Sequence, residues 1–230
     1  MEYTLYWNSD EEGLLTFLDY DKTEWLCFDI FVLGEEAELV IKSGSIVDKC
    51  KKVDSIRGKV FDRLEDCVWK ACSLLWDRGM EEVFFVDKQG ESLMHALKEA
   101  DVIEPAYREY MMKRSFSAED IVSDSFKEIE IRAEEDSFIC ENKERSFFCR
   151  LLPYQAENSF YLYEVEVLEA VRNQGIATTC LKQLFSELVK KKKEVTMYLQ
   201  VGSYNEVAVH LYQKLGFELY EEICYNVIKE

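Results

Sequence analysis

A glycine stands where a long amphipathic segment begins, in the stretch VRNQGIATTCLKQLF (Val171 to Phe185). Gly175 lowers helix propensity by about 1 kcal/mol relative to alanine, so its presence here needs another explanation. A helix N-terminus offers main-chain N–H groups and the positive end of the helix dipole, and small residues let a diphosphate approach those amides. Alternatively, Gly175 only permits tight packing between a strand and the helix, and this segment alone leaves both explanations open.

A second segment, LQVGSYNEVAVHLYQKLGFE, also contains residues with interpretable spacing. Asn205 is a favourable N-cap, and Gly216 is placed to end the helix as its C′ residue. The apolar face of this helix runs through Ala208, Leu211 and Leu215. The two segments therefore predict two helices, the first with a start that is accessible to an anion and the second with a side-chain cap.

Patterns of apolar residues predict the elements that position these helices. We expect a strand at 159–170, a helix at 174–190, a strand at 195–201, a helix at 205–215 and a last strand at 217–228. Three short strands separated by charged turns precede them, at 126–134, 137–142 and 145–155. The predicted fold class is α/β in the broad sense (α+β), with a mixed, mostly antiparallel sheet flanked by helices.

The first half of the chain shows a fainter version of the same order about 115 residues earlier. FDRLEDCVWKACSLLW falls opposite the first helix, EEVFFVDK opposite the strand that follows, and SLMHALKEADV opposite the second helix. We predict domains at 1–115 and 126–230, with a polar linker at Ser115–Ser125. The first domain is interpreted either as a degenerate copy of the second or as an accessory domain.

The charge of the chain excludes some classes of partner. A formal net charge of −18 argues against nucleic acid as a partner, because nucleic-acid binding depends on counterion release by clustered lysines and arginines. A negative field would concentrate a cationic amine substrate, although acidity that only maintains solubility is the simpler explanation.

The spacing of the cysteines and the hydropathy of the chain indicate its expected cellular location. Eight cysteines contain no CxxC pair and are accompanied by only two histidines, so we expect buried thiols and no metal site. The sequence starts without a basic, apolar leader and has no stretch long enough to cross a bilayer. We therefore expect a cytoplasmic protein that does not bind membranes.

Taken together, the two helical segments resemble the GNAT superfamily of acyl-CoA-dependent N-acyltransferases over residues 126–230. The family's diphosphate loop is Arg or Gln, two residues, Gly, one residue, then Gly or Ala, and it matches Arg172, Gly175 and Ala177. Its second signature, an Asn, then Ala, Tyr and Gly-Phe, matches Asn205, Ala208, Tyr212, Gly216 and Phe217. The resemblance implies a GNAT-like sheet in which two parallel strands, at 159–169 and 195–201, splay apart.

The resemblance also implies that acetyl-CoA is the cofactor. Carried over by position, the residues that would bind it are Leu168 through its main chain, the loop and helix start Arg172, Asn173, Gln174, Gly175, Ile176, Ala177 and Thr178, and Asn205. Main-chain donors suit both a diphosphate and a strand-like chain of amides. Two alternatives stay open: Arg172 is a surface ion-pair partner, and Asn205 is only a helix cap.

For catalysis, the resemblance implies that Tyr212 protonates the departing thiolate, and a phenol with a pKa near 10 is a reasonable acid for this leaving group. The alternative is a tyrosine that fills core space. Glu164 and Glu166 alternate with two valines, so we expect both carboxylates on one face of the strand beside the thioester, where each would raise the pKa of the other. One of them would accept the proton of the attacking amine; the alternative is a solvated strand face.

The chain also departs from the family's pattern. Residues 126–230 are too few for the pair of helices that normally follows the first strand, so the acceptor cannot be identified from sequence. In the first half, Val60 and Asp62 stand opposite Gly175 and Ala177, which predicts one cofactor site per chain. We expect an N-acetyltransferase for a primary amine, a small-molecule and cationic acceptor; the alternative is a non-catalytic CoA-binding regulatory or interaction protein.

Overall fold

The computed structural model describes residues 2–9, 11–18, 24–45, 63–88, 92–120 and 129–229. The chain forms two compact units. Unit 1 contains Met1–Arg108 and Ile223–Glu230, and unit 2 contains Glu109–Glu222. The positions Val60 and Asp62, on which the prediction of a single cofactor site rests, lie outside the described residues.

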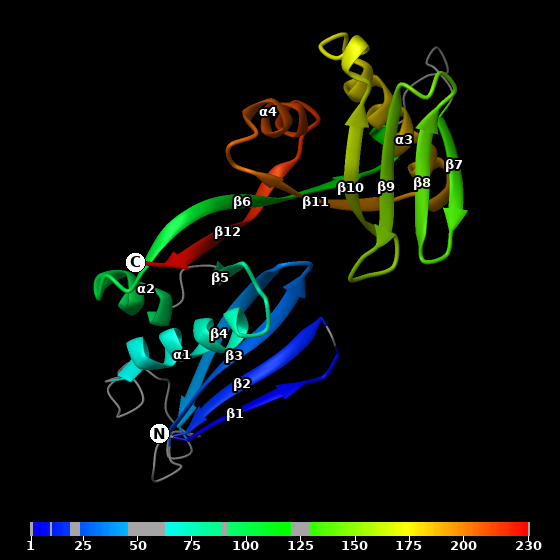
Figure 1. Cartoon of the computed structure of the whole chain (residues 1–230). Coiled ribbons are helices and arrows are strands. Elements are labelled where there is room, and N and C mark those ends of the chain that lie inside the picture. Colours follow the sequence, from blue (N-terminus) through cyan, green and yellow to red (C-terminus); the bar gives the residue numbers. More distant parts are fainter. Residues whose placement is uncertain are drawn as a thin grey trace. The chain divides into compact units, whose positions relative to one another are not determined.

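Unit 1 is a sheet covered on one face by helices (Figure 1). Four antiparallel strands come first: β1 (Glu2–Trp7), β2 (Glu12–Leu18), β3 (Glu24–Leu33) and β4 (Glu36–Ser45). Helix α1 (Leu64–Trp76), β5 (Glu82–Lys88) and α2 (Ser92–Glu99) follow, and β5 pairs parallel to β4. The buried stripe of α1, which includes Cys67, Val68 and Leu75, packs on the alternate apolar residues of the sheet.

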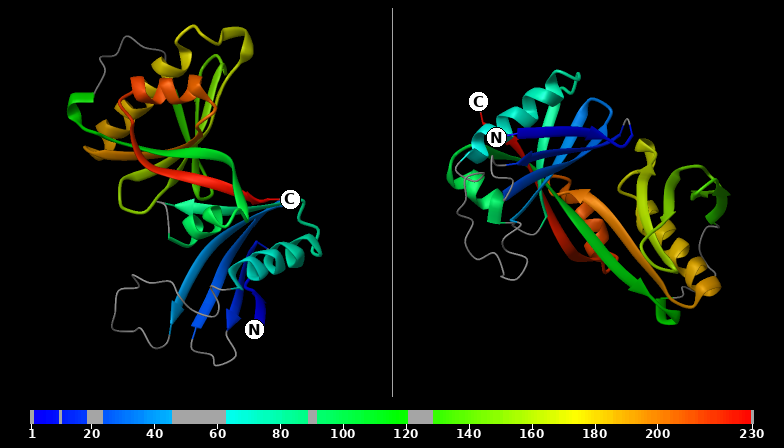
Figure 2. Two further views of the ribbon diagram at one scale, coloured as in Figure 1. Left: turned by 90° about the vertical axis from the view of Figure 1, so that its left-hand side faces the viewer. Right: turned by 90° about the horizontal axis from the view of Figure 1, so that it is seen from below.

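Unit 2 repeats this arrangement with its own strands and helices (Figure 2). Its antiparallel strands are β7 (Ile129–Glu134), β8 (Ser137–Asn142), β9 (Phe147–Pro153) and β10 (Ser159–Val167). Then come α3 (Ile176–Lys192), β11 (Val195–Gly202), α4 (Glu206–Lys214) and the start of β12 (Glu218–Ile228). Between β7 and β8 the chain makes only a short turn. This described region therefore contains no counterpart of the two helices that follow the first strand in the family's pattern.

The elements predicted from apolar patterns are confirmed, and so is the mixed, mostly antiparallel sheet. Helix α3 buries the predicted stripe, including Cys180, Leu184 and Leu188, against the sheet of unit 2. Helix α4 starts at its N-cap Asn205 and ends before Gly216, whose φ of 81° is the left-handed conformation of a C′ glycine. Four further strands, β1 to β4, lie in the first 45 residues, for which the patterns specified no elements.

Each half of the chain ends in a strand that completes a sheet begun by the other half. In β6 (Ile103–Phe116), residues 109–116 belong to unit 2 and pair with β11. In β12, residues 223–226 belong to unit 1 and pair with β5. The strand order is β1-β2-β3-β4-β5-β12 in unit 1 and β6-β11-β10-β9-β8-β7 in unit 2. Element order therefore repeats along the chain, as predicted, with the last strands exchanged.

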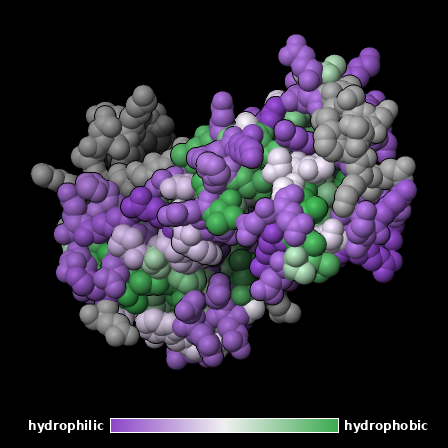
Figure 3. All heavy atoms as spheres, turned by 90° about the horizontal axis from the view of Figure 1, so that it is seen from above, coloured by the Kyte–Doolittle hydropathy of each residue, from purple (hydrophilic) through white to green (hydrophobic). Residues whose placement is uncertain are grey.

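None of the seven described cysteines forms a disulfide, and six of them are buried. Burial raises the pKa of Cys72 to about 12, as expected for a thiol that packs as a small apolar group. Hydrophilic residues cover much of the face shown in Figure 3, in keeping with the high content of charged residues. None of the helices in the described ranges has the length and hydropathy required to span a membrane.

Candidate active site

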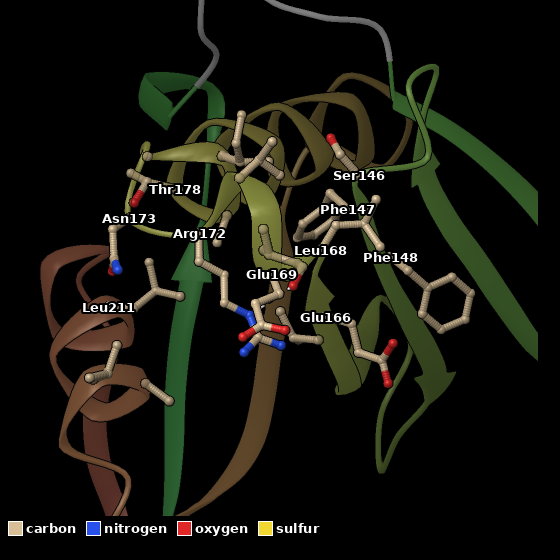
Figure 4. Close-up of a pocket in the computed structure, with 18 of the residues that line it drawn as sticks. Ser146, Phe147, Phe148, Glu166, Leu168, Glu169, Arg172, Asn173, Thr178 and Leu211 are labelled. Atoms are coloured by element: carbon tan, nitrogen blue, oxygen red, sulfur yellow. Dashed lines mark hydrogen bonds between the residues drawn. The ribbon is translucent and has the colours of Figure 1, made fainter.

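A cavity of about 880 Å³ opens in unit 2 between β10, the start of α3 and the start of α4 (Figure 4). It has the size of a small-molecule site. Ten of the twelve residues predicted for the site line it: Glu166, Leu168, Arg172, Asn173, Gly175, Ile176, Ala177, Thr178, Asn205 and Tyr212. The two that do not line it are Glu164 and Gln174.

The cavity exists because two strands separate. The parallel pairing of β10 with β11 extends only from Ser159 to Leu162 on β10. On the β9 side, the register of β10 shifts by one residue between Tyr163 and Glu166, and Glu164 there has a φ of 49°. This β-bulge bends β10 at the point where its pairing with β11 ends. The predicted separation of the two parallel strands is therefore present.

Helix α3 begins at the cavity without a side-chain cap. Its N-cap is Gly175, with φ 75° and ψ 9°, and this residue makes no side-chain cap to the first turn. Thr179 donates to the Gly175 carbonyl at 3.0 Å, so the N–H groups of Ile176, Ala177 and Thr178 have no acceptor within the helix. The first turn also contains no acidic residue. These donors, at the positive end of the helix dipole, are suited to bind an anion.

The φ of 75° explains why glycine is present here, because other L-residues are strained in this region. A Cβ at Gly175 would meet no protein atom within 4 Å, so tight strand–helix packing is not the reason for the glycine. The open space beside Gly175 is part of the cavity. Of the two explanations left open by the sequence, access to the amides is favoured.

Helix α4 contributes Asn205 and Tyr212. The Asn205 side chain accepts from the Ala208 N–H at 3.2 Å, so it caps the helix and lines the cavity. Tyr212 is buried, and its ring packs edge-on against Phe217 at 5.8 Å between centroids. Burial, and then Cys149 and Tyr161, raise the pKa of Tyr212 to about 12. The Tyr212 hydroxyl therefore stays protonated at neutral pH, as a proton donor must.

The main-chain groups that face the gap do not belong to Leu168, the residue that the resemblance implies. Leu168 already uses both of its main-chain groups, donating to the Ser146 carbonyl and accepting from Val171, each at 3.0 Å. Successive residues of a strand direct these groups to opposite sides, so Val165 and Val167 present theirs to the side from which β11 has separated. Both valines line the cavity. The alternation along the chain before Leu168 would have indicated these two valines if the bond from Leu168 to Ser146 had been known.

The structure separates the two predicted carboxylates. Glu164 is the extra residue of the bulge, and its carboxylate binds Arg150 at 2.8 Å. The expectation that both glutamates face the cavity is therefore wrong for Glu164. The bulge also reverses the alternation of β10: Glu166 is on the face of Tyr161 and Tyr163, whereas Val165 and Val167 pack in the core with α3. Uninterrupted alternation along β10 would have placed Glu166 on the core face instead.

The Arg172 side chain extends into the cavity, between the helix that carries Leu211 and the strand that carries Glu166 (Figure 4). Its Nε donates to the Val167 carbonyl at 3.0 Å. Gln174, which does not line the cavity, donates from Nε2 to the Ala170 carbonyl at 3.4 Å. Arg145, which the sequence analysis did not single out, is a second cation at the cavity. The described residues contain no group of three or more histidine, cysteine or acidic side chains that could hold a metal ion.

Comparison with solved structures shows the fold. A GCN5-related N-acetyltransferase from Sphaerobacter thermophilus has a TM-score of 0.57 at 12% identity, over 96% of this chain and 81% of that one. A GNAT-family acetyltransferase from Colwellia psychrerythraea gives 0.57 at 13%, over 95% and 86%. A tandem GNAT protein from the clavulanic acid biosynthesis pathway gives 0.55 at 8%, over 96% and 85%.

Comparison of the sequence with protein families shows the family. Among curated proteins no match was found. The profile of the acetyltransferase (GNAT) family matches residues 103–217, which is half of the chain and includes both helices that line the cavity. The match also includes Gly175, Asn205 and Tyr212. The chain therefore belongs to the acetyltransferase (GNAT) family.

Proposed function

We propose that the protein transfers an acetyl group from acetyl-CoA to a primary amine by direct attack of the amine. The observation that carries this proposal is that one cavity combines the uncapped start of α3, the open edge of β10 and the buried hydroxyl-bearing Tyr212. Residues 126–230 would hold the catalytic site, and residues 1–115 would be a degenerate or accessory repeat. The seven described cysteines, none of which forms a disulfide, support a cytoplasmic location.

The residues at the cavity fit a coenzyme that carries a diphosphate and an extended chain of amides. The N–H groups of Ile176, Ala177 and Thr178 would hold the diphosphate. The main chain of Val165 and Val167 would pair with the amides of the pantetheine arm as a neighbouring strand does. Arg172 and Arg145 place positive charge at this cavity in an otherwise acidic protein.

Arg172 has a second part in this proposal. Its bond to the Val167 carbonyl covers an acceptor on the open edge of β10. A carbonyl has two lone pairs, so Val167 can accept from a pantetheine amide beside Arg172 or after Arg172 has moved to the diphosphate. Asn205 would contact the coenzyme through the part of its side chain that does not cap α4.

Tyr212 and Glu166 are the proposed acid and base. Acetyl-CoA would supply an acyl group activated as a thioester. The amine nitrogen forms the C–N bond while the C–S bond breaks; Glu166, directly or through water, accepts the proton lost by nitrogen, and Tyr212 supplies a proton to sulfur. The products are an amide and a thiol, and solvent returns the proton from Glu166 to Tyr212.

The proposal is tested by a thiol-release assay with acetyl-CoA and a panel of polyamines, amino acids, aminoglycosides and peptides. We expect release above the rate of spontaneous hydrolysis with at least one class of amine. Isothermal titration with CoA should accompany the assay. Tight CoA binding without release on any acceptor would support the non-catalytic alternative, and the absence of CoA binding would contradict both.

A further inference from the structure

Tyrosines from adjacent strands gather on the face of the unit 2 sheet that is opposite α3. Tyr161 of β10 and Tyr198 of β11 are register partners in the last part of the parallel pairing. Tyr154 joins them, with its ring centroid 5.6 Å from that of Tyr161 and 5.1 Å from that of Tyr198. Tyr163 continues the row, 6.3 Å from Tyr161. We call Tyr154, Tyr161, Tyr163 and Tyr198 the tyrosine face.

The tyrosine face already binds one ammonium group. The Nζ atom of Lys113 lies 5.1 Å from the ring centroid of Tyr198 and 5.3 Å from that of Tyr220. Both distances are within the range at which an aromatic ring attracts a cation through its negative face. The geometry of these rings therefore suits alkylammonium groups, and the intramolecular contact uses only the end of the row that is formed by Tyr198.

An acidic residue lies near Tyr161, in the part of the row that Lys113 does not contact. Glu109 of β6 is half-buried and accepts a hydrogen bond from Gln200, which is two residues beyond Tyr198 on β11. Burial is the main cause that raises the pKa of Tyr161 to about 12, and the charge of Glu109 is the next. Tyr161 is thus within electrostatic reach of the Glu109 carboxylate.

The tyrosine face borders the gap between β10 and β11. Tyr161 precedes Leu162, where the parallel pairing ends, and Tyr163 and Gln200 extend beyond that point on the two separating strands. Tyr161 also contributes to the raised pKa of Tyr212, which lines the cavity on the helix side. Because of the bulge, Glu166 is on the tyrosine face too. An acceptor bound on this face could therefore reach the gap.

We propose that the tyrosine face, together with Glu109, binds the acceptor as an aliphatic diamine or polyamine. The inference rests on the proposed function. The nitrogen that attacks a thioester must be neutral, so it cannot be the cation that aromatic rings and a carboxylate recognise. A second amine, held as an ammonium ion near Tyr161 and Glu109, would direct the neutral one into the gap beside Tyr212. Acceptors with a single amine lack this second contact.

The test compares 1,4-diaminobutane with n-butylamine, which has the same chain length and one amine. Isothermal titration at pH 7.5 into the full chain, with and without CoA, should show at least about tenfold tighter binding of the diamine. Tyr161→Leu and Glu109→Gln should each weaken diamine binding by about 3- to 30-fold. Tyr161→Phe keeps the ring and should bind the diamine within about twofold of the unaltered protein.

Two controls keep the result specific. Glu119→Gln removes an exposed carboxylate elsewhere in unit 2 and should leave diamine affinity unchanged. CoA affinity and circular dichroism of each variant show that it is folded. Equal affinity for the two amines, or diamine binding unaffected by both Tyr161→Leu and Glu109→Gln, would overturn the inference. Thiol release with single amines would then leave the proposed function intact. Failure of the proposed function would instead appear as an absence of thiol release with every amine, or as an absence of CoA binding.

Discussion

Two side chains approach the gap between β10 and β11 from different elements, and their environments suit opposite tasks. Tyr212 of α4 is buried, and burial is the main cause that raises the pKa of its hydroxyl to about 12. Glu166 of β10 is exposed, on the face opposite α3. A protonated phenol on one side and a solvated carboxylate on the other are an acid and a base that a single proton-transfer sequence requires.

Replacing Glu166 should therefore slow the reaction more than replacing its neighbour. We expect Glu166→Gln to lower kcat/KM by about 100-fold, the lower end for a lost general base. Glu164→Gln is the matched control, because Glu164 is paired with Arg150 and does not line the cavity. Steady-state kinetics of the two variants test the assignment; equal effects would remove Glu166 from the base role.

Tyr212→Phe should lower kcat by about 100-fold with little change in the KM for acetyl-CoA, because the hydroxyl acts on the leaving sulfur. The raised pKa of Tyr212, about 12, also predicts a pH dependence. The phenol stays protonated through pH 10, so kcat should not decline between pH 8 and 10. A decline centred near pH 9 in the unaltered enzyme, lost in Tyr212→Phe, would contradict this assignment.

Single residues also show how far the sequence could predict the site. The loop and helix start could be located at the cavity from sequence, with the exception of Gln174, because their placement depends on local spacing and on a glycine with positive φ. Glu164, Glu166 and Leu168 could not be placed correctly, because a one-residue bulge changes both the face and the hydrogen-bonding side of everything after it. Nothing in the residue types around Glu164 marks the bulge.

Among the elements, the two helices at the cavity start in different ways. Helix α4 has a side-chain cap in Asn205, whereas α3 has none. The difference matches their proposed tasks, since α3 would present its free N–H groups to a ligand and α4 would only border it. The capped helix could be predicted from sequence with its start and end, because Asn205 and Gly216 are strong local signals.

Asn205 allows the cap to be separated from ligand binding. Asn205→Ala should reduce the free energy of unfolding by about 1 kcal/mol through loss of the bond to the Ala208 N–H. Asn205→Asp keeps a capping oxygen and should retain stability, but its added negative charge should weaken CoA binding. Urea unfolding and isothermal titration of both variants measure the two effects. Unchanged CoA affinity in Asn205→Asp would mean that Asn205 is only a cap.

In the whole molecule, exchange of the last strands gives each compact unit a strand segment from the other half of the chain. Unit 1 obtains Ile223 and Tyr225 from the end of the chain, and both are buried in a cluster with Phe84. Tyr225 stacks on Tyr107 at 4.4 Å between centroids. The repeat of elements could be predicted from apolar patterns, but the exchange could not, because either last strand has residues suited to either sheet.

Tyr225→Ala should destabilise unit 1 by about 3–5 kcal/mol, the usual cost of removing a buried aromatic side chain. All four tryptophans, Trp7, Trp25, Trp69 and Trp76, belong to unit 1, so tryptophan fluorescence reports on that unit alone. Urea unfolding followed by fluorescence should shift to lower concentration. An unchanged transition would mean that these last residues do not stabilise unit 1.

The stoichiometry of CoA follows from the difference between the repeats. The proposed diphosphate site depends on Gly175 and its small neighbours in unit 2, whereas the equivalent sequence positions in the first half carry Val60 and Asp62. Isothermal titration should therefore give one CoA per chain. Two equivalents per chain would show that the first half also binds the coenzyme.

The central claim is that main-chain donors at the start of α3 hold the diphosphate of CoA. The most direct measurement is a titration of ¹⁵N-labelled protein with CoA and, separately, with pantetheine, which lacks the diphosphate. The amide signals of Ile176, Ala177 and Thr178 should shift with CoA and remain unchanged with pantetheine at the same concentration. Saturation by CoA that leaves these three signals in place would contradict the account.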